Sequence, residues 1–322
     1  MKAAVYYENG APSVFRYEDV PDPQPSENEI LIRVEAISVE GGDTLNRLGG
    51  GLRTNPHVVG HQAAGTIVEV GSRVADFAVG ERVVTLNADG SHAELRTAYP
   101  NFTWKIPPGL STEQAAAVPT AFGTAHDSLF EFGRLATGET ALIHAGASGV
   151  GIAAIQMAKR AGATVLATAS SNERLERLVE FGLDAGINYV HEDFVPRVRE
   201  LTEGRGADVI VDSVGGENLN KSLRALAYRG RCVSMGNAGR EARDLLDISP
   251  MRQNNQKFTS YFLGAELFVG TRAYAQIASI LDDIASGNLR VVIDRTYPLE
   301  DAGEAHAYIE SRQSFGRVIL VP

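Results

Sequence analysis

The stretch GETALIHAGASGVG, residues 138–151, decides how this chain folds. Its apolar part, 141–145, predicts a buried strand, and residues 150–160 predict the helix that follows. Small residues between the two let the backbone turn tightly and approach a pyrophosphate, while the helix offers free N–H groups and the positive end of its dipole. A glycine-rich turn alone is weak evidence, but this one lies between a clear strand and a clear helix. We therefore expect a dinucleotide to rest on Ser148, Gly149 and Val150.

Strand and helix signals continue to alternate after this stretch. Glycines at 162 and 182 lie just past two predicted helices, as is common at helix ends. We predict strand 164–168, helix 173–181, strand 207–212, helix 217–228, and strands near 231–235 and 258–263. Strict alternation of this kind is typical of an α/β protein with a doubly wound parallel sheet.

The flanking parts have a different pattern. Before about Pro119, short β-rich runs at 29–37, 65–70 and 81–86 are separated by Gly, Pro, Asn and Asp, which indicates an irregular β-rich unit. After about residue 265 we predict helix 272–286, strand 291–294, helix 302–310 and strand 316–321. We expect this tail to return to the N-terminal unit, because 322 residues favour two domains. The predicted domains are 119–264, which binds the dinucleotide, and 1–118 with 265–322.

Composition excludes several classes of partner. The formal net charge of -10 opposes nucleic acid phosphates and anionic membrane surfaces, so we expect neither a nucleic acid nor a membrane partner. Residues 1–7 read as a short strand, and no segment reaches the roughly 20 apolar residues of a membrane span, so we expect a cytoplasmic protein. The only cysteine, Cys232, can form no internal disulfide and is expected to be a buried strand residue.

The motifs taken together resemble the zeta-crystallin-like quinone oxidoreductases, a zinc-independent branch of the medium-chain dehydrogenase/reductase superfamily. Besides 138–151, the resemblance includes GHQAAG at 60–65, VGERV at 79–83, PTAF at 119–122, INY at 187–189, DSVGG at 212–216 and GRVI at 316–319. It implies a Rossmann domain inserted in a β-rich GroES-like catalytic domain, with NADPH as cofactor. It also implies a small-molecule substrate, a quinone, an enone or a related carbonyl. Ser148 replaces a glycine usual in this family, and its hydroxyl can add a phosphate contact.

Residues 163–174, which include the predicted strand 164–168 and the turn after it, predict a preference for NADPH over NADH. An NAD enzyme normally places an acid there to bind the ribose 2′-hydroxyl, whereas this chain has Ala169. Ser170 and Ser171 supply neutral donors, and Arg174 supplies a charge for a 2′-phosphate. The alternative is that Arg174 lies on a solvated helix face. Further cofactor contacts implied by the resemblance are Thr120, Tyr189, Ser213, Val214, Gly236, Phe262, Leu263 and Arg312.

Glu40, His61 and Thr120 are the candidate catalytic residues. They align with the three places at which zinc alcohol dehydrogenases bind a catalytic ion, but threonine is a poor zinc ligand, so we expect no metal. Hydrogen bonds must then polarise the substrate. Further candidate donors lie in a predicted loop, 39–47, where Asp43 is expected to orient its neighbours. Family members usually have asparagine at position 40 and often tyrosine at position 45; Glu40, with two glycines after it, predicts a more acidic and roomier site.

Three functions remain open on this evidence. The first is an NADPH-dependent reductase that transfers a hydride to a quinone or to the activated C=C bond of an enone. The second is a carbonyl or enoyl-thioester reductase of the same superfamily. The third is a non-catalytic NADPH-binding protein, since Glu40 and Leu45 remove the family's usual polar pair.

The late edge of the predicted parallel sheet suggests a homodimer. An apolar edge strand near 231–235 or 258–263 is liable to pair with another chain, and a two-fold dimer closes that contact. The resemblance also implies dimers joined at these edges. The alternative is a monomer whose edge is covered by residues 238–256.

Overall fold

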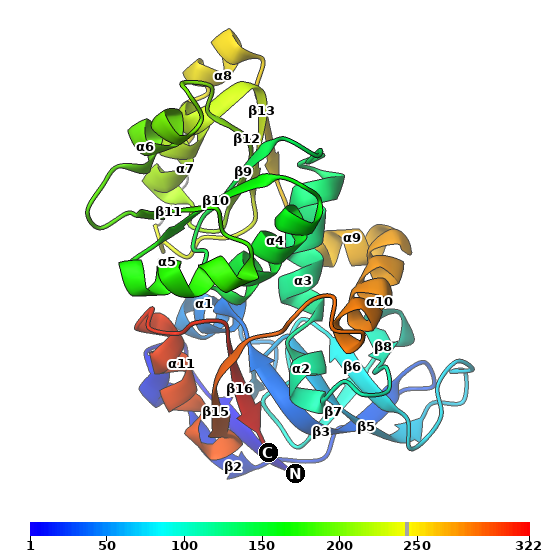
Figure 1. Cartoon of the computed structure of the whole chain (residues 1–322). Helices are drawn as coiled ribbons and strands as arrows, with labels where there is room; N and C mark the ends of the chain where they lie inside the picture. Colours follow the sequence, from blue (N-terminus) through cyan, green and yellow to red (C-terminus); the bar gives the residue numbers. More distant parts are fainter. Residues whose placement is uncertain (242–244) are drawn as a thin grey trace. The chain divides into compact units, whose positions relative to one another are not determined.

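The computed structural model describes residues 1–241 and 245–322, which divide into two compact units (Figure 1). Unit 1 comprises Met1–Thr120 and Leu267–Pro322, and unit 2 comprises Ala121–Glu266. These bounds lie close to the predicted domain bounds. The functional roles assigned to the two domains stay predictions.

Unit 2 is built on a six-stranded sheet in the order β11-β10-β9-β12-β13-β14. Every pair of neighbouring strands is parallel, which confirms the fold class predicted from the alternating pattern. The strands are β9 (Thr140–Ile143), β10 (Thr164–Ala169), β11 (Ala185–Asn188), β12 (Ala207–Asp212), β13 (Leu226–Ser234) and β14 (Lys257–Ser260). Cys232 is buried in β13, as predicted.

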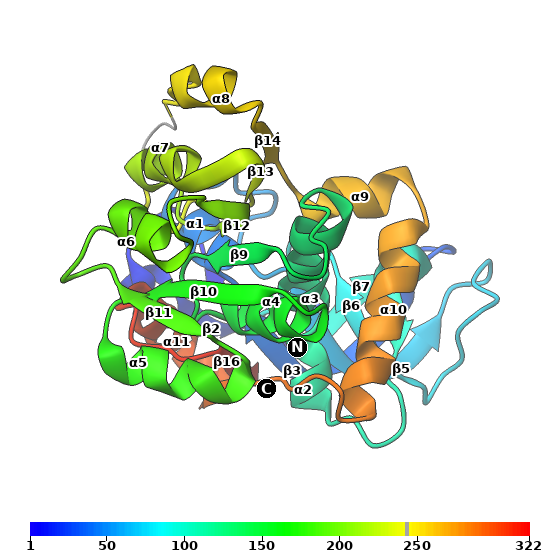
Figure 2. The same ribbon diagram turned by 45° about the horizontal axis from the view of Figure 1, so that its top comes forward.

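Helices cover both faces of this sheet. In Figures 1 and 2, α4 (Gly149–Arg160) and α5 (Asn172–Leu178) lie on one face, and α6 (Phe194–Leu201) and α7 (Gly216–Ala225) lie on the other. The sheet carries an unbroken apolar layer, since Leu142, Leu166, Ile210 and Cys232 are all buried in one cluster with residues of α6 and α7. The alternating strand residues Ile143, Val165 and Val211 are buried as well, and burial on both faces explains why the strands read as continuous apolar runs.

Several elements of unit 2 escaped the sequence analysis, among them β11, α6 and α8 (Ser249–Asn254). The strand β11 has only four residues, one of them Gly186, and gives no periodic signal. The helix α6 had a usable signal, because Asp193 accepts a hydrogen bond from the Val195 N–H as its N-cap, and Pro196 lies in its first turn.

Two predicted boundaries in unit 2 are wrong. The helix predicted over 217–228 ends at Ala225, because Leu226 pairs with Ala207 and begins β13. The strand predicted over 258–263 ends at Ser260, and Leu263 begins α9 (Leu263–Val269). Between them Tyr261 is buried, with its N–H bonded to the Ser234 carbonyl.

Unit 1 contains a seven-stranded sheet ordered β15-β16-β3-β5-β6-β8, with β7 also paired to β3. A smaller sheet has the order β2-β1-β4. The C-terminal strand β16 pairs antiparallel with β3, which confirms that the tail returns to the N-terminal unit. The strands are β1 (Lys2–Tyr6), β2 (Arg16–Asp19), β3 (Ile30–Val39), β4 (His57–Val58), β5 (Gln62–Val70), β6 (Arg82–Leu86), β7 (Leu95–Ala98), β8 (Thr103–Lys105), β15 (Ile293–Pro298) and β16 (Arg317–Val321).

The helices of unit 1 are distributed around these sheets. They are α1 (Gly41–Gly49), α2 (Thr112–Ala116), α10 (Arg272–Ala285) and α11 (Ala302–Glu310); α3 (Pro119–His126) and α9 cross the unit boundaries. No helix in the described ranges is both long and apolar enough to cross a membrane.

Candidate active site

A buried ion pair lies where β3 ends and β16 begins. The register of these strands places Val39 opposite Val318, so Glu40 and Arg317 meet directly, and their guanidinium and carboxylate groups form a contact. Arg317 also donates to the Ser38 hydroxyl, at 3.0 Å from Nε and 2.6 Å from Nη2. Both side chains of the pair are more than nine-tenths buried. Burial raises the pKa of Glu40 above its ordinary value, and the Arg317 charge opposes that rise.

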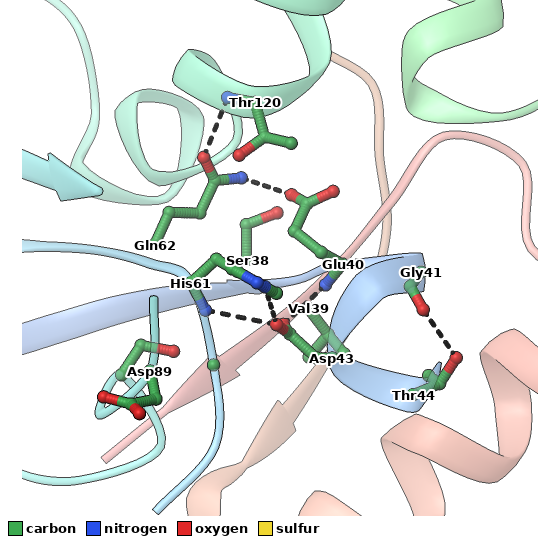
Figure 3. Close-up of polar contacts among 12 residues, drawn as sticks. Ser38, Val39, Glu40, Gly41, Asp43, Thr44, His61, Gln62, Asp89 and Thr120 are labelled. Atoms are coloured by element: carbon green, nitrogen blue, oxygen red, sulfur yellow. Dashed lines mark hydrogen bonds and ion pairs between the residues drawn. The ribbon is translucent and has the colours of Figure 1, made fainter. Parts of the chain in front are cut away.

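Gln62 connects this ion pair to Thr120. Figure 3 shows the Gln62 amide between the two: its nitrogen donates to the Glu40 carboxylate, and its oxygen accepts from the Thr120 N–H at 3.0 Å. The Thr120 hydroxyl is buried and has no hydrogen-bond partner among the described residues. A buried hydroxyl without a partner costs free energy, so this oxygen is a natural contact for a ligand.

His61 and Asp43 form the second half of the site. Asp43 contacts the His61 Nδ1 atom, accepts from the His61 N–H at 3.1 Å, and accepts from the Glu40 N–H at 2.8 Å (Figure 3). The carboxylate is fully buried, whereas the imidazole is 25% exposed. Burial alone would lower the pKa of His61, but the Asp43 charge and hydrogen bond outweigh it and raise that pKa. The same pair lowers the pKa of Asp43 against its burial. These contacts agree with an orienting role for Asp43, which stays a prediction.

Two expectations about this region are wrong. Residues 39–47 are not a loop, because α1 begins directly after Glu40, with Asp43 in its first turn accepting the Glu40 N–H. The site is not made acidic by Glu40, because Arg317 pairs with that carboxylate. At Gly42 a Cβ would lie 3.1 Å from the Cε1 atom of His61, so glycine provides room for the imidazole, whereas a Cβ at Gly41 would meet nothing within 4 Å. The expectation of a roomier site stays a prediction.

Two of the three side chains considered for zinc, Glu40 and His61, are engaged in these contacts, whereas the Thr120 hydroxyl has no partner among the described residues. Glu40 pairs with Arg317, and His61 Nδ1 contacts Asp43. No group of three or more His, Cys, Asp or Glu side chains is gathered as metal ligands within residues 1–241 and 245–322. The expected absence of a catalytic metal stays a prediction.

The glycine-rich turn of unit 2 fits a pyrophosphate. Ser148 is the N-cap of α4, and its hydroxyl accepts from the Gly151 N–H at 3.0 Å. The Gly149 and Val150 N–H groups have no hydrogen-bond partner in the part of the chain that the structure describes. A Cβ at Gly151 would lie 2.4 Å from the Ala145 carbonyl oxygen, so the turn requires glycine there. Two free N–H groups at a helix N-terminus suit an anion.

The next turn gathers the residues expected to select NADPH. Ser171 is the N-cap of α5 and accepts from the Arg174 N–H at 3.3 Å, so its hydroxyl is partly engaged. Ser170 and Arg174 are half-buried, and the Arg174 guanidinium has no ion pair among the described residues. Tyr189 donates its N–H to the Ala169 carbonyl at 3.2 Å and leaves its ring 47% exposed. The carboxyl ends of β10 and β11 therefore bring these groups together without any acid at position 169.

The remaining residues predicted to contact the cofactor differ in location and exposure. Ser213 and Val214 follow β12, and a Cβ at Gly236 would lie 3.1 Å from the Ser213 carbonyl oxygen, so all three share the carboxyl edge of the sheet. Phe262 is 72% exposed after β14, and Leu263 is buried. Arg312 belongs to unit 1, where it follows α11 in the left-handed region at φ 58°.

Sequence reasoning missed two residues of the site, Gln62 and Arg317. Gln62 had a detectable signal, because a fully buried amide in an apolar strand needs defined partners. Arg317 had none that identifies its partner, since Glu40 lies 277 positions away.

Comparisons with known proteins agree over the whole chain. Residues 26–124 match the family model for the alcohol dehydrogenase GroES-like domain, and residues 149–293 match the model for zinc-binding dehydrogenase. The quinone oxidoreductase of Rattus norvegicus is 33% identical, over 100% of this chain and 98% of that protein. The 2-haloacrylate reductase of a Burkholderia species is 32% identical, over 99% and 98%. The crystal structure of Escherichia coli quinone oxidoreductase complexed with NADPH has a TM-score of 0.94 at 30% identity and covers 100% of both chains.

The two full-length relatives cover both units, including the glycine-rich turn and the strands that carry the Glu40, His61 and Arg317 contacts. The chain therefore belongs to the quinone oxidoreductase family of the medium-chain dehydrogenase/reductase superfamily.

Proposed function

We propose that this chain is an NADPH-dependent reductase that transfers a hydride to a quinone or to the activated C=C bond of an enone. The observation that carries the proposal is the His61 imidazole, which is held at Nδ1 by a buried carboxylate and is partly exposed. The names of the relatives support it, since they include quinone oxidoreductases and a 2-haloacrylate reductase. NADPH oxidation on addition of quinones and enones tests it.

The residues of unit 2 fit NADPH. The Gly149 and Val150 N–H groups would bind the pyrophosphate, and Arg174 would bind the 2′-phosphate, which Ala169 does not repel. The Escherichia coli relative, whose structure contains NADPH, supports this choice of cofactor. When bound, NADPH supplies the hydride.

His61 would supply the proton. Hydride addition to the β-carbon of an enone leaves negative charge on the α-carbon and oxygen, and a proton must reach the α-carbon to complete the reduction. Asp43 raises the pKa of His61 and so favours the imidazolium over the neutral ring, in which case Nε2–H would be the donor. Transfer leaves neutral His61 still bonded to Asp43 through Nδ1.

Glu40 and Thr120 have different roles in this proposal. Glu40, neutralised by Arg317, is a positioning residue that holds Gln62, and Gln62 fixes the Thr120 backbone. The partnerless Thr120 hydroxyl would contact the ligand. Since the His61–Asp43 pair provides a proton donor without help from positions 40 and 45, it favours an enzyme over a non-catalytic NADPH-binding protein.

Arg174→Ala is expected to weaken NADPH binding by about 1–3 kcal/mol, because it removes a charge-assisted contact to the 2′-phosphate. NADH binding should be nearly unchanged. Titration by nucleotide fluorescence measures both. Arg177→Ala, one turn further along α5, is the control and should affect neither cofactor. Equal binding of NADPH and NADH by the wild type would contradict the assignment.

The proposal includes a homodimer in the cytoplasm. A lone, buried Cys232 suits a reducing compartment, and β14 is the edge strand of the sheet in unit 2. Of the segment expected to cover this edge in a monomer, residues 242–244 lie outside the described residues, and α8 (Ser249–Asn254) contacts α7 and β13.

Light scattering is expected to give twice the 34.5 kDa mass of one chain. Tyr261 is unsuitable for probing the edge, because it is buried and its hydroxyl donates to Asp127 at 3.0 Å. Thr259→Lys in β14 should instead shift the mass toward one chain, because a charge there opposes edge pairing. Thr164→Lys in the interior strand β10 is the control. A mass of one chain for the wild type would refute the dimer.

A further inference from the structure

Four polar side chains are buried in a row at the carboxyl edge of the sheet in unit 2. They come from β10, the residue after β9, α7 and β12, and each is at most 2% exposed: Thr168, His144, Ser222 and Asp212. His144 bonds to the Thr168 hydroxyl at 3.1 Å through Nδ1 and to the Ser222 hydroxyl at 3.0 Å through Nε2. Ser222 donates to Asp212 Oδ2 at 2.7 Å.

The hydrogen bonds of this row have one consistent direction. The Ser222 hydroxyl has one proton, which it gives to the Asp212 carboxylate at 2.7 Å or to the Asn218 carbonyl at 3.0 Å; in either case its oxygen is left to accept from the His144 Nε2–H. His144 Nδ1 then accepts from the Thr168 hydroxyl, whose oxygen accepts from the Ala145 N–H at 3.3 Å. Only the neutral imidazole protonated at Nε2 satisfies both neighbours.

Each end of the row is hydrogen-bonded to the backbone of a turn that is expected to contact the dinucleotide. At one end Thr168 holds the Ala145 N–H, and its carbonyl accepts from the Gly146 N–H at 2.9 Å, within the glycine-rich turn. At the other end Asp212 Oδ1 accepts from the Val214 N–H at 2.8 Å and the Gly215 N–H at 3.0 Å. The row therefore ties the turn after β9 to the turn after β12 through β10.

We propose that His144 is a positioning residue for the dinucleotide, which sets the relative placement of the glycine-rich turn and the Val214 turn through Thr168, Ser222 and Asp212. The inference rests on the proposed NADPH function. His144 itself touches neither phosphate nor nicotinamide in this scheme, since it is 1% exposed and both of its nitrogens are occupied within the protein. Burial lowers the pKa of His144, which agrees with a neutral ring.

Thr168→Val tests the row with a nearly isosteric change. Loss of both hydroxyl bonds is expected to weaken NADPH binding by the apoprotein about fivefold, the size of one hydrogen bond of about 1 kcal/mol. Thr168→Ser keeps the hydroxyl and should restore binding to within about twofold. Thr202→Val is the matched control, because Thr202 is also buried in unit 2 but bonds to Val198 and Gly206, outside the row. It should lower stability with unchanged NADPH binding.

The histidine can be observed directly in the wild type. In protein labelled with ¹⁵N-histidine, His144 should show a slowly exchanging Nε2–H and an unprotonated Nδ1 at pH 7, and the signal that vanishes in His144→Phe identifies it among the seven histidines. A protonated Nδ1 at His144 would overturn the inference.

Binding outcomes separate this inference from the proposed function. Unchanged NADPH affinity in Thr168→Val, or an equal loss in Thr202→Val, would overturn the role of the row while the proposed function stands. Failure of the wild type to bind any nicotinamide dinucleotide would overturn both.

Discussion

His61→Phe is expected to lower kcat for enone reduction by about 10²- to 10⁴-fold, the range of a general acid, while NADPH binding stays unchanged. The loss should be smaller for a quinone, because its oxygen can take a proton from water. His126→Phe is a matched control: His126 also contacts an aspartate, Asp127, at 3.2 Å and is 20% exposed, but it lies outside the site. Retention of kcat by His61→Phe to within a few-fold would refute the assigned proton donor.

The pH profile provides a second test of the same residue. In the proposed mechanism the acid form of His61 is the active one, and Asp43 raises its pKa, so kcat/KM should fall as pH rises through a value above the ordinary pKa of histidine. Asp43→Asn removes the charge that favours the imidazolium, so the fall in kcat/KM should occur at lower pH in this variant. A fall at the same pH as in the wild type would show that another group controls the rate.

Arg317→Met is expected to destabilise unit 1 by about 3–5 kcal/mol at pH 7, because it leaves the Glu40 carboxylate buried without its cation. The single tryptophan, Trp104, is buried in β8 of unit 1, so urea unfolding followed by its fluorescence reports on this unit. Arg73→Met is the control, because its ion pair with Glu27 is exposed and should contribute less than about 1 kcal/mol.

The raised pKa of Glu40 determines how the stability lost in Arg317→Met should depend on pH. Its folded pKa lies above the ordinary value, so the folded state binds more protons and gains stability as pH falls through that pKa. The deficit of Arg317→Met should therefore shrink at lower pH, and adding Glu40→Gln should recover part of it at pH 7. Stability equal to wild type at pH 7 would contradict the buried pair.

The sequence predicted unit 2 better than the site in unit 1, for a physical reason. Parallel strands buried on both faces appear in the sequence as continuous apolar runs, and the helix after the first strand is announced by its N-cap, Ser148. Both signals are local and do not depend on distant residues. The state of Glu40 depends instead on Arg317, which approaches only when β16 pairs with β3. The glycines at 41 and 42 also concealed the start of α1, although Asp43, three residues after Glu40, was a cap signal.

The most direct test of the central claim follows the hydride itself. NADPH deuterated at C4, with each face labelled in turn, is incubated with an enone and enzyme pretreated with EDTA. We expect one of the two labelled forms to transfer one deuterium to the β-carbon of the saturated product, with the α-carbon taking its hydrogen from water through His61. Product that is unlabelled with both labelled forms, no oxidation of NADPH with any enone or quinone, or activity that EDTA abolishes and zinc restores, would contradict the account.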